Sequence, residues 1–224
     1  MPGRNVPLVN EQIYHIFNRG VAKRSIFLTA NYYRRALETI WFYQKDSLAL
    51  SFSDFLSIPS NQKPLTNDRI EKLPNRIEII AYCLMPNHLH ILIKQLIANG
   101  ISSFMSDFQN SFTKYFNIKN KRKGHLFEGK FKAVRIETDE QLIHTSRYIH
   151  LNPTTSSLVK DASLHAYPWS SLPEYLNEDS PQKCSKESML AYFKNRKDYR
   201  EFVYDQIDYQ RSLRHKQHLF LDDY

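Results

Sequence analysis

Two histidines separated by one residue stand in an apolar run that reads as a β-strand. His88 and His90 flank Leu89 in the run HLHILIKQ. Because side chains alternate between the two faces of a strand, both imidazoles point to the same side, as a pair of metal ligands would. The same spacing also fits two ordinary polar residues on the exposed face of a half-buried strand. The pair is therefore a candidate metal site.

A second group of reactive side chains lies in the segment RYIHLNP, residues 147–153. On a helix, Tyr148 and Asn152 share one face because they are four residues apart, and His144 lies one turn earlier. A phenol, an amide oxygen and an imidazole then form one stripe. The alternative is structural, with the tyrosine covering the core and the asparagine capping the helix before Pro153.

The elements that must position these residues follow from the hydrophobic pattern. We expect strands over residues 13–18, 77–85, 88–95 and 131–136, and helices from about residue 31, over 101–116, and over 140–151. Asn31 and Thr138 are expected helix caps, Pro86 and Asn87 a turn, and Pro153 the end of the last helix. This order predicts an α+β fold with a ferredoxin-like antiparallel sheet, helices on one face, and an additional helix that carries Tyr148.

The domain organisation is expected to be simple. Residues 1–175 form one domain, in which 51–75 is a variable insertion because it contains three prolines among Ser and Asn. Residues 176–224 are predicted to be a helical extension. The aromatic stripe over 101–116 is interpreted as core.

Charge and cysteine content narrow the class of protein. The net charge is +8, and residues 114–135 carry eight Lys or Arg against one Glu, which is typical of contact with a polyanion or of a solvated basic surface. Two cysteines exclude a disulfide framework and a four-cysteine zinc site. Without an apolar leader or a run of about 20 apolar residues, we expect a cytoplasmic protein with no membrane partner.

Five motifs occur together in a recognisable order. They are YHIFNRG, YCLMPNHLHILI, GHLFEGKFKAVRIE, YIHLNP and YPWSS, within residues 14–175. This set resembles the HUH-type single-tyrosine transposases, and among them the REP-associated tyrosine transposase group.

The resemblance implies a metal-dependent enzyme that cuts and rejoins single-stranded or hairpin DNA. It implies Tyr148 as nucleophile through a covalent 5′-phosphotyrosine, and His88, His90 and Asn152 as ligands of Mg²⁺ or Mn²⁺. Related enzymes include dimers, whereas the REP-associated group looks able to work as monomers, so monomer and homodimer both remain open. Zinc is disfavoured because a closed structural zinc site needs four ligands and usually cysteine. The expected DNA contacts are Arg19, Lys121, Arg122, Lys123, His125, Lys130 and Lys132.

Two other functions remain open from the sequence. A non-catalytic nucleic-acid-binding module of the same fold would bind DNA without cutting it. A metal-dependent hydrolase that uses the histidines alone would cut DNA without a protein-linked intermediate.

Overall fold

In the computed structural model, which describes residues 7–180 and 183–217, four strands form one antiparallel sheet. The strands are β1 (Ile13–Arg19), β2 (Ile77–Met85), β3 (His88–Gln95) and β4 (Lys132–Ile136). Their hydrogen-bonded order is β2-β3-β1-β4, so strands that follow one another through a helix are separated by a third strand. This is the split β-α-β arrangement of ferredoxin-like proteins, and it confirms the α+β prediction.

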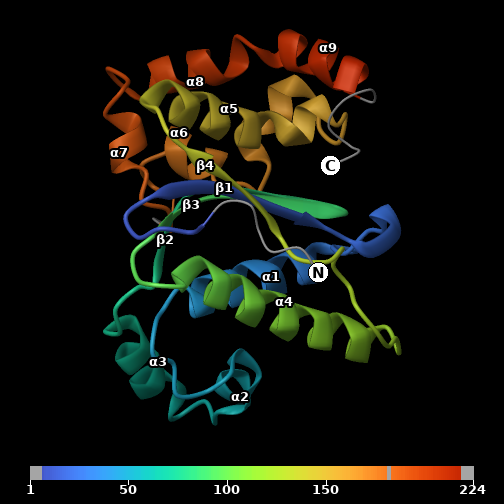
Figure 1. The fold of residues 1–224 in the computed structure, drawn as a ribbon, viewed down its shortest axis with the longest axis vertical. Coiled ribbons are helices and arrows are strands. Elements are labelled where there is room, and N and C mark those ends of the chain that lie inside the picture. Colours follow the sequence, from blue (N-terminus) through green and yellow to red (C-terminus); the bar gives the residue numbers. More distant parts are fainter. Residues whose placement is uncertain (1–6, 181–182, 218–224) are drawn as a thin grey trace. The chain divides into compact units, whose positions relative to one another are not determined.

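Helices account for most of the remaining described chain (Figure 1). The α-helices are α1 (Ala30–Tyr43), α2 (Phe52–Ser57), α3 (Lys63–Glu71), α4 (Gly100–Lys119), α5 (Asp139–Thr155), α6 (Leu172–Leu176), α7 (Glu187–Leu190), α8 (Arg196–Tyr204) and α9 (Ile207–Gln217). Two short 3-10 helices are η1 (Val21–Lys23) and η2 (Asp161–Ala166).

Packing divides the chain into two compact units. The first consists of Met1–Glu78, Pro86–Leu89 and Ile93–Arg135, and the second of Ile79–Met85, His90–Leu92 and Ile136–Tyr224. Strands β2 and β3 therefore contribute residues to both. This division differs from the boundary expected at residue 175, which stays a prediction.

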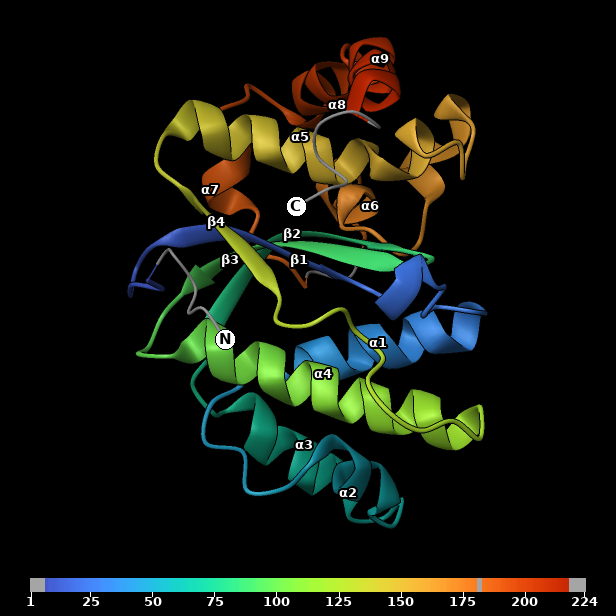
Figure 2. The ribbon, with the colours of Figure 1, turned by 45° about the vertical axis from the view of Figure 1, so that its right-hand side comes forward.

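The first unit has its core between α1 and α4, which lie side by side in both ribbon views (Figure 2). The apolar stripe of α4 is buried as its spacing predicts, with Phe104, Phe108 and Phe112 fully covered. Their rings continue to Phe127, whose centroid lies 6.0 Å from that of Phe108. The expectation that this stripe is core is confirmed.

One local expectation in the first unit, the helix cap at Asn31, is wrong, and the variable insertion at 51–75 stays a prediction. Helix α1 begins at Ala30 after Thr29, so Asn31 lies inside the helix, where its side chain accepts a hydrogen bond from Arg34. The segment 51–75 contains α2 and α3, and its residues Phe52 and Ile70 are buried. Helix α2 forms despite its short length because Ser51 and Asp54 make a reciprocal capping box.

In the second unit, the outer edge of β2 is paired with the YPWSS segment. The Leu84 amide donates to the Trp169 carbonyl (2.8 Å), and the Ser171 amide donates to the Tyr82 carbonyl (3.0 Å). The Tyr167 hydroxyl adds a bond to the Leu84 carbonyl (2.8 Å). This motif therefore anchors the chain after α5 to the strand.

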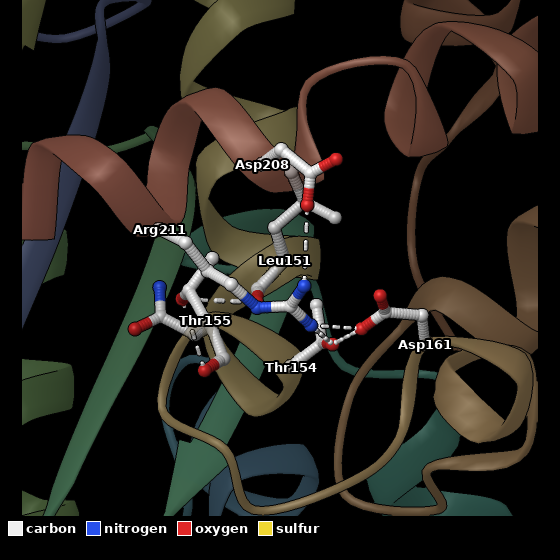
Figure 3. A network of polar contacts seen from close by, with 7 residues as sticks. Leu151, Thr154, Thr155, Asp161, Asp208 and Arg211 are labelled. Atoms are coloured by element: carbon white, nitrogen blue, oxygen red, sulfur yellow. Dashed lines mark hydrogen bonds and ion pairs between the residues drawn. The ribbon is translucent and has the colours of Figure 1, made fainter.

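Helix α5 packs against α8 and α9 in the second unit (Figures 1 and 2). At the C-terminal end of α5, Arg211 of α9 pairs with Asp161 and donates to the Thr154 hydroxyl (3.1 Å) (Figure 3). The hydrogen bonds from Thr154 and Arg211 lower the pKa of Asp161. This polar cluster holds the second turn of α9 beside the end of α5.

Candidate functional site

The first histidine of the candidate pair follows directly on the β2–β3 turn. Pro86 and Asn87 form that turn, as the sequence predicts. Asn87 donates from Nδ2 to the Lys23 carbonyl (3.2 Å), so its Oδ1 faces Nδ1 of His88 (2.6 Å). Because an amide oxygen only accepts, His88 donates from Nδ1, which leaves the lone pair of the neutral ring on Nε2.

His90 lies two residues further along β3 and is buried, with 6% of its surface exposed. Leu89 between them is fully buried. The two imidazoles therefore share one face of β3 by strand alternation, as the spacing predicts. Whether they hold a common ion stays a prediction.

The candidate nucleophile is carried by α5. Thr138 caps this helix as expected, because its hydroxyl accepts from the Gln141 amide (3.1 Å). Tyr148 lies in the middle of the helix and is 39% exposed. Part of this residue therefore faces solvent, unlike the buried tyrosines Tyr175 and Tyr199 of the same unit.

The tyrosine ring lies against the second histidine. The centroids of the Tyr148 and His90 rings are 5.5 Å apart, and the rings are perpendicular. Both residues belong to the second unit. Spacing alone could not predict this contact, because it depends on how α5 packs on β3.

Asn152 lies one turn beyond Tyr148 and is 3% exposed. Its Nδ2 donates to the Tyr148 carbonyl (3.0 Å). Only the nitrogen of the Asn152 side-chain amide can donate to a carbonyl, so this bond fixes the orientation of that amide. Its Oδ1 therefore points in a different direction. The oxygen is thus the atom that a cation would use.

The expected end of α5 at Pro153 is wrong. The helix continues to Thr155, with Pro153 inside its last turn. A proline there has no amide hydrogen for the Ile149 carbonyl, but the helical hydrogen bonds resume beyond it, with the Ser156 amide donating to the Asn152 carbonyl (3.0 Å). The hydroxyls of Thr155 and Ser156 add bonds to the Leu151 carbonyl (3.1 Å) and the Asn152 carbonyl (2.7 Å). Asn152 is consequently a helical residue with a fixed backbone.

The donor set expected from the sequence is two imidazoles and one amide oxygen, which differs from the four ligands, usually with cysteine, of a structural zinc site. Of these donors, the amide oxygen and the positions left for water or phosphate suit Mg²⁺ or Mn²⁺. Within residues 7–180 and 183–217, no cluster of three or more His, Cys, Asp and Glu side chains is placed to bind a metal ion. A common ion on His88, His90 and Asn152 stays a prediction.

His144 shares the stripe of Tyr148 but is engaged elsewhere. Its Nδ1 lies 2.5 Å from Arg147 Nη2, and its Nε2 lies 3.8 Å from the Glu140 carboxylate. Arg147 in turn lies over the Phe202 ring, 4.2 Å from its centroid. These contacts assign His144 to the packing of α5 on α8.

The expected DNA contacts all lie in the first unit, and most are exposed. The exposed ones are Lys121, Lys123, His125, Lys130 and Lys132. Arg122 instead donates to Asn117 Oδ1 (2.8 Å) and to the His125 carbonyl, and Arg19 pairs with Glu128. These two arginines shape the basic loop, so a phosphate would have to compete for them.

The loop itself is anchored to the end of β1. The Val21 amide donates to the Leu126 carbonyl (2.9 Å), and the Glu128 amide donates to the Arg19 carbonyl (2.8 Å). Phe127 is buried against α4, so it is packed rather than presented to a base. His125 remains exposed at the tip.

One buried histidine received no role from the sequence. His150 lies between Tyr148 and Asn152 in the chain and is fully buried. Its two ring nitrogens contact Tyr199 and Ser171. No sequence signal marks it, because its partners lie 49 and 21 residues away.

Comparison with known proteins agrees with the motifs. Residues 69–152 match the family described as "Transposase IS200 like". The matched stretch contains His88, His90, Tyr148 and Asn152. No curated protein sequence matches the chain.

The fold is similar to that of a REP-associated tyrosine transposase, solved bound to a REP hairpin. That match has a TM-score of 0.54 and 16% identity, and it covers 83% of this chain and 92% of the other. A transposase candidate from Deinococcus radiodurans gives a TM-score of 0.35 at 12% identity, over 66% of this chain and 95% of that one. The family match over residues 69–152 and the likeness of fold to the REP-associated tyrosine transposase agree with the resemblance that the motifs indicate. In the described part of the chain, no helix is long and apolar enough to cross a membrane.

Proposed function

We propose that this protein is a metal-dependent single-stranded DNA endonuclease and strand transferase of the transposase type. The observation that carries the proposal is the contact between the exposed Tyr148 and the buried His90. It brings the candidate nucleophile of α5 to the strand that bears both candidate ligands. The family match over residues 69–152 supports the same reading.

In the proposed reaction, the Tyr148 oxygen attacks a DNA phosphorus atom. A bond forms between that oxygen and phosphorus while the bond from phosphorus to the 3′ oxygen breaks. The phenol loses one proton and the leaving 3′ oxygen gains one, so the step is neutral in protons. The products are a 5′-phosphotyrosine and a free 3′-hydroxyl, and attack by a 3′-hydroxyl on the phosphotyrosine rejoins the strand without ATP.

His88, His90 and Asn152 would hold the divalent cation, Mg²⁺ or Mn²⁺. When bound, such an ion polarises the phosphodiester and stabilises negative charge in the transition state. The protein's part is orientation: Asn87 fixes the ring of His88, and the Tyr148 carbonyl fixes the amide of Asn152. Two of the three proposed ligands, His88 and Asn152, are thus oriented by a hydrogen bond, which is typical of metal sites.

The proposed substrate is single-stranded or hairpin DNA. The structural relative was solved with a REP hairpin, and the exposed lysines of the loop 121–132 are suited to phosphate contacts. Lys130→Gln should weaken binding uniformly across hairpin sequences and reduce the slope of log Kd against log salt by about 1. Fluorescence anisotropy at several salt concentrations measures this, and an unchanged slope would remove Lys130 from the interface.

We also propose that one chain supplies the whole chemistry. Tyr148 lies against His90 of the same chain and the same unit, so a partner's tyrosine is not needed. A monomer then suffices for cleavage.

The test is incubation with single-stranded hairpin DNA taken from the flanks of its own gene, with Mg²⁺ or Mn²⁺, followed by denaturing electrophoresis. The proposal predicts a metal-dependent protein–DNA adduct and a shortened strand with a 3′-hydroxyl. Binding without cleavage under either metal would favour the non-catalytic module instead. Cleavage without an adduct would favour a hydrolase.

A further inference from the structure

The helix that carries Tyr148 is fixed from its opposite face by a buried chain of hydrogen bonds. His150 Nδ1 lies 2.7 Å from the Tyr199 hydroxyl of α8, and His150 Nε2 lies 2.7 Å from the Ser171 hydroxyl. All three residues are fully buried in the second unit. The Tyr175 ring closes the cluster, with its centroid 4.9 Å from that of His150.

The hydrogen bonds of this chain are mutually consistent. Ser146 donates to the Ile143 carbonyl (3.0 Å), so Tyr199 donates to Ser146 (3.2 Å) and accepts from His150 Nδ1. His150 Nε2 then accepts from the Ser171 hydroxyl, which is its nearer partner at 2.7 Å, while the Tyr82 carbonyl lies 3.3 Å from the same hydroxyl and the Tyr82 amide donates to it (2.9 Å). Each side chain of the chain thus has hydrogen-bond partners, and a buried polar network whose members are paired stabilises one arrangement.

The ionisation of the cluster agrees with this arrangement. A neutral imidazole has one donor and one acceptor nitrogen, which matches the two contacts of His150. Burial raises the pKa of Tyr199, which keeps its hydroxyl protonated.

The position of His150 on the helix gives the network its consequence. Each helical residue turns the side chain by about 100°, so a residue two positions from both Tyr148 and Asn152 faces away from them. Through Tyr199, His150 is tied to α8, and through Ser171 it is tied to the backbone of β2 at Tyr82. Rotation of α5 about its axis would break both bonds.

We propose that His150 is a positioning residue for the reaction at Tyr148, and that α8, through Tyr199, is an integral part of the catalytic unit. This inference rests on the proposed function, because it concerns the aim of the same nucleophile. The inference goes beyond the proposed function because it includes α8, which lies outside the family match that ends at residue 152.

Two matched pairs of variants test the inference. Tyr199→Phe removes the hydroxyl that binds His150, whereas Tyr175→Phe removes an equally buried hydroxyl that donates to the Ile80 carbonyl (2.7 Å). Ser171→Ala removes the other partner of His150, whereas Ser170→Ala removes a buried neighbour that accepts only from the Leu172 amide (3.3 Å). Each pair makes the same chemical change on and off the network.

The measurement is the rate constant of covalent adduct formation at saturating hairpin DNA and Mn²⁺, together with the Kd for DNA and the Tm of each variant. Tyr199→Phe and Ser171→Ala should slow adduct formation by about tenfold, because small misplacements of a nucleophile cost up to about 100-fold. The Kd for DNA should change by no more than about twofold, because each substitution alters only the orientation of α5. Tyr175→Phe and Ser170→Ala should keep the wild-type rate at a similar loss of Tm.

The outcomes separate the two proposals. Equal rates in both members of each pair, with wild type forming the adduct, would overturn the inference and leave the proposed function intact. Absence of any adduct from wild type would overturn both. If Tyr199→Phe fails to fold, the Ser171→Ala and Ser170→Ala pair decides, since it acts at the other end of the same chain of bonds.

Discussion

The two faces of helix α5 differ in what they offer to their surroundings. One face presents Tyr148, which is 39% exposed, and the other presents His150, which has no exposed surface. Tyr148 contacts the ring of a candidate metal ligand, whereas His150 is surrounded by hydroxyl groups that fix it. In our proposal, one helix thus carries a reactive side and a positioning side only two residues apart. The difference shows that a histidine two residues from a candidate nucleophile can have an entirely buried environment of its own.

The most direct test of this difference is to remove the hydroxyl of Tyr148. Tyr148→Phe should abolish the covalent adduct, by at least about 1000-fold, because no other oxygen of α5 takes its place as nucleophile. Hairpin binding should be retained, since the ring remains. Tyr209→Phe is the matched control, because Tyr209 is an exposed tyrosine of α9. A persistent adduct in Tyr148→Phe would refute the assignment.

The next largest effect is expected at Asn152, on the reactive side. Asn152→Ala removes the proposed oxygen ligand and should weaken Mn²⁺ binding by at least about tenfold, the lower end of losses seen around metal ligands. Asn152→Asp keeps an oxygen at the same reach and should bind Mn²⁺ at least as well as wild type. Isothermal titration with Mn²⁺ alone measures both. Equal affinity in Asn152→Ala and wild type would exclude Asn152 as a ligand.

Burial of His150 should make the free energy of unfolding depend on pH. The unfolded chain protonates His150 near pH 6.5, whereas the folded protein does so only near pH 3. Between these values the unfolded state binds more protons, so the free energy of unfolding falls as pH falls. From pH 6.5 to 5 this group should cost about 2 kcal/mol of stability.

The matched variant for this prediction is His150→Gln, which lacks the titrating ring. Its free energy of unfolding should start lower at pH 7 and decline less steeply towards pH 5. Urea unfolding at several pH values provides both curves. Parallel curves would mean that His150 is not held neutral by burial.

The smallest effect is expected where α5 meets α9. Arg211 and Asp161 are 34% and 41% exposed, so solvent screens their ion pair. Arg211→Ala should therefore lower the free energy of unfolding by only about 0 to 1 kcal/mol and leave adduct formation unchanged. Thermal unfolding with and without added salt measures it. A loss of unfolding free energy as large as that of Tyr199→Phe would contradict the expectation that the buried contacts of α5 stabilise the protein more than its surface contacts.

Regular elements were predictable from the sequence because their patterns are local. The stripe of Phe104, Phe108 and Phe112 repeats at helical spacing, and Pro86 with Asn87 marks the turn before His88. The end of α5 was predicted wrongly, because a proline need not end a helix when it lies in the last turn, where Pro153 removes only one amide hydrogen bond. Asn31 was a poor guide to the start of α1, because Thr29 occupies the N-cap position and the helix begins at Ala30.

The candidate site was predictable as residues but not as an arrangement. Strand and helix periodicity give His88 with His90, and Tyr148 with Asn152, as two separate pairs. The contact between Tyr148 and His90 depends on how α5 packs on β3, which no spacing encodes. The role of His150 depends on Tyr199 and Ser171, and a buried polar network leaves no periodic signal in the sequence.

The most direct test of the central claim is to map the DNA-linked residue. After reaction with hairpin DNA and nuclease trimming, trypsin should release residues 148–160, or 136–160 if cleavage at Arg147 is blocked, and either peptide contains Tyr148 as its only tyrosine. The account predicts that mass spectrometry finds a 5′-linked nucleotide on that tyrosine. A nucleotide on any other residue would contradict it.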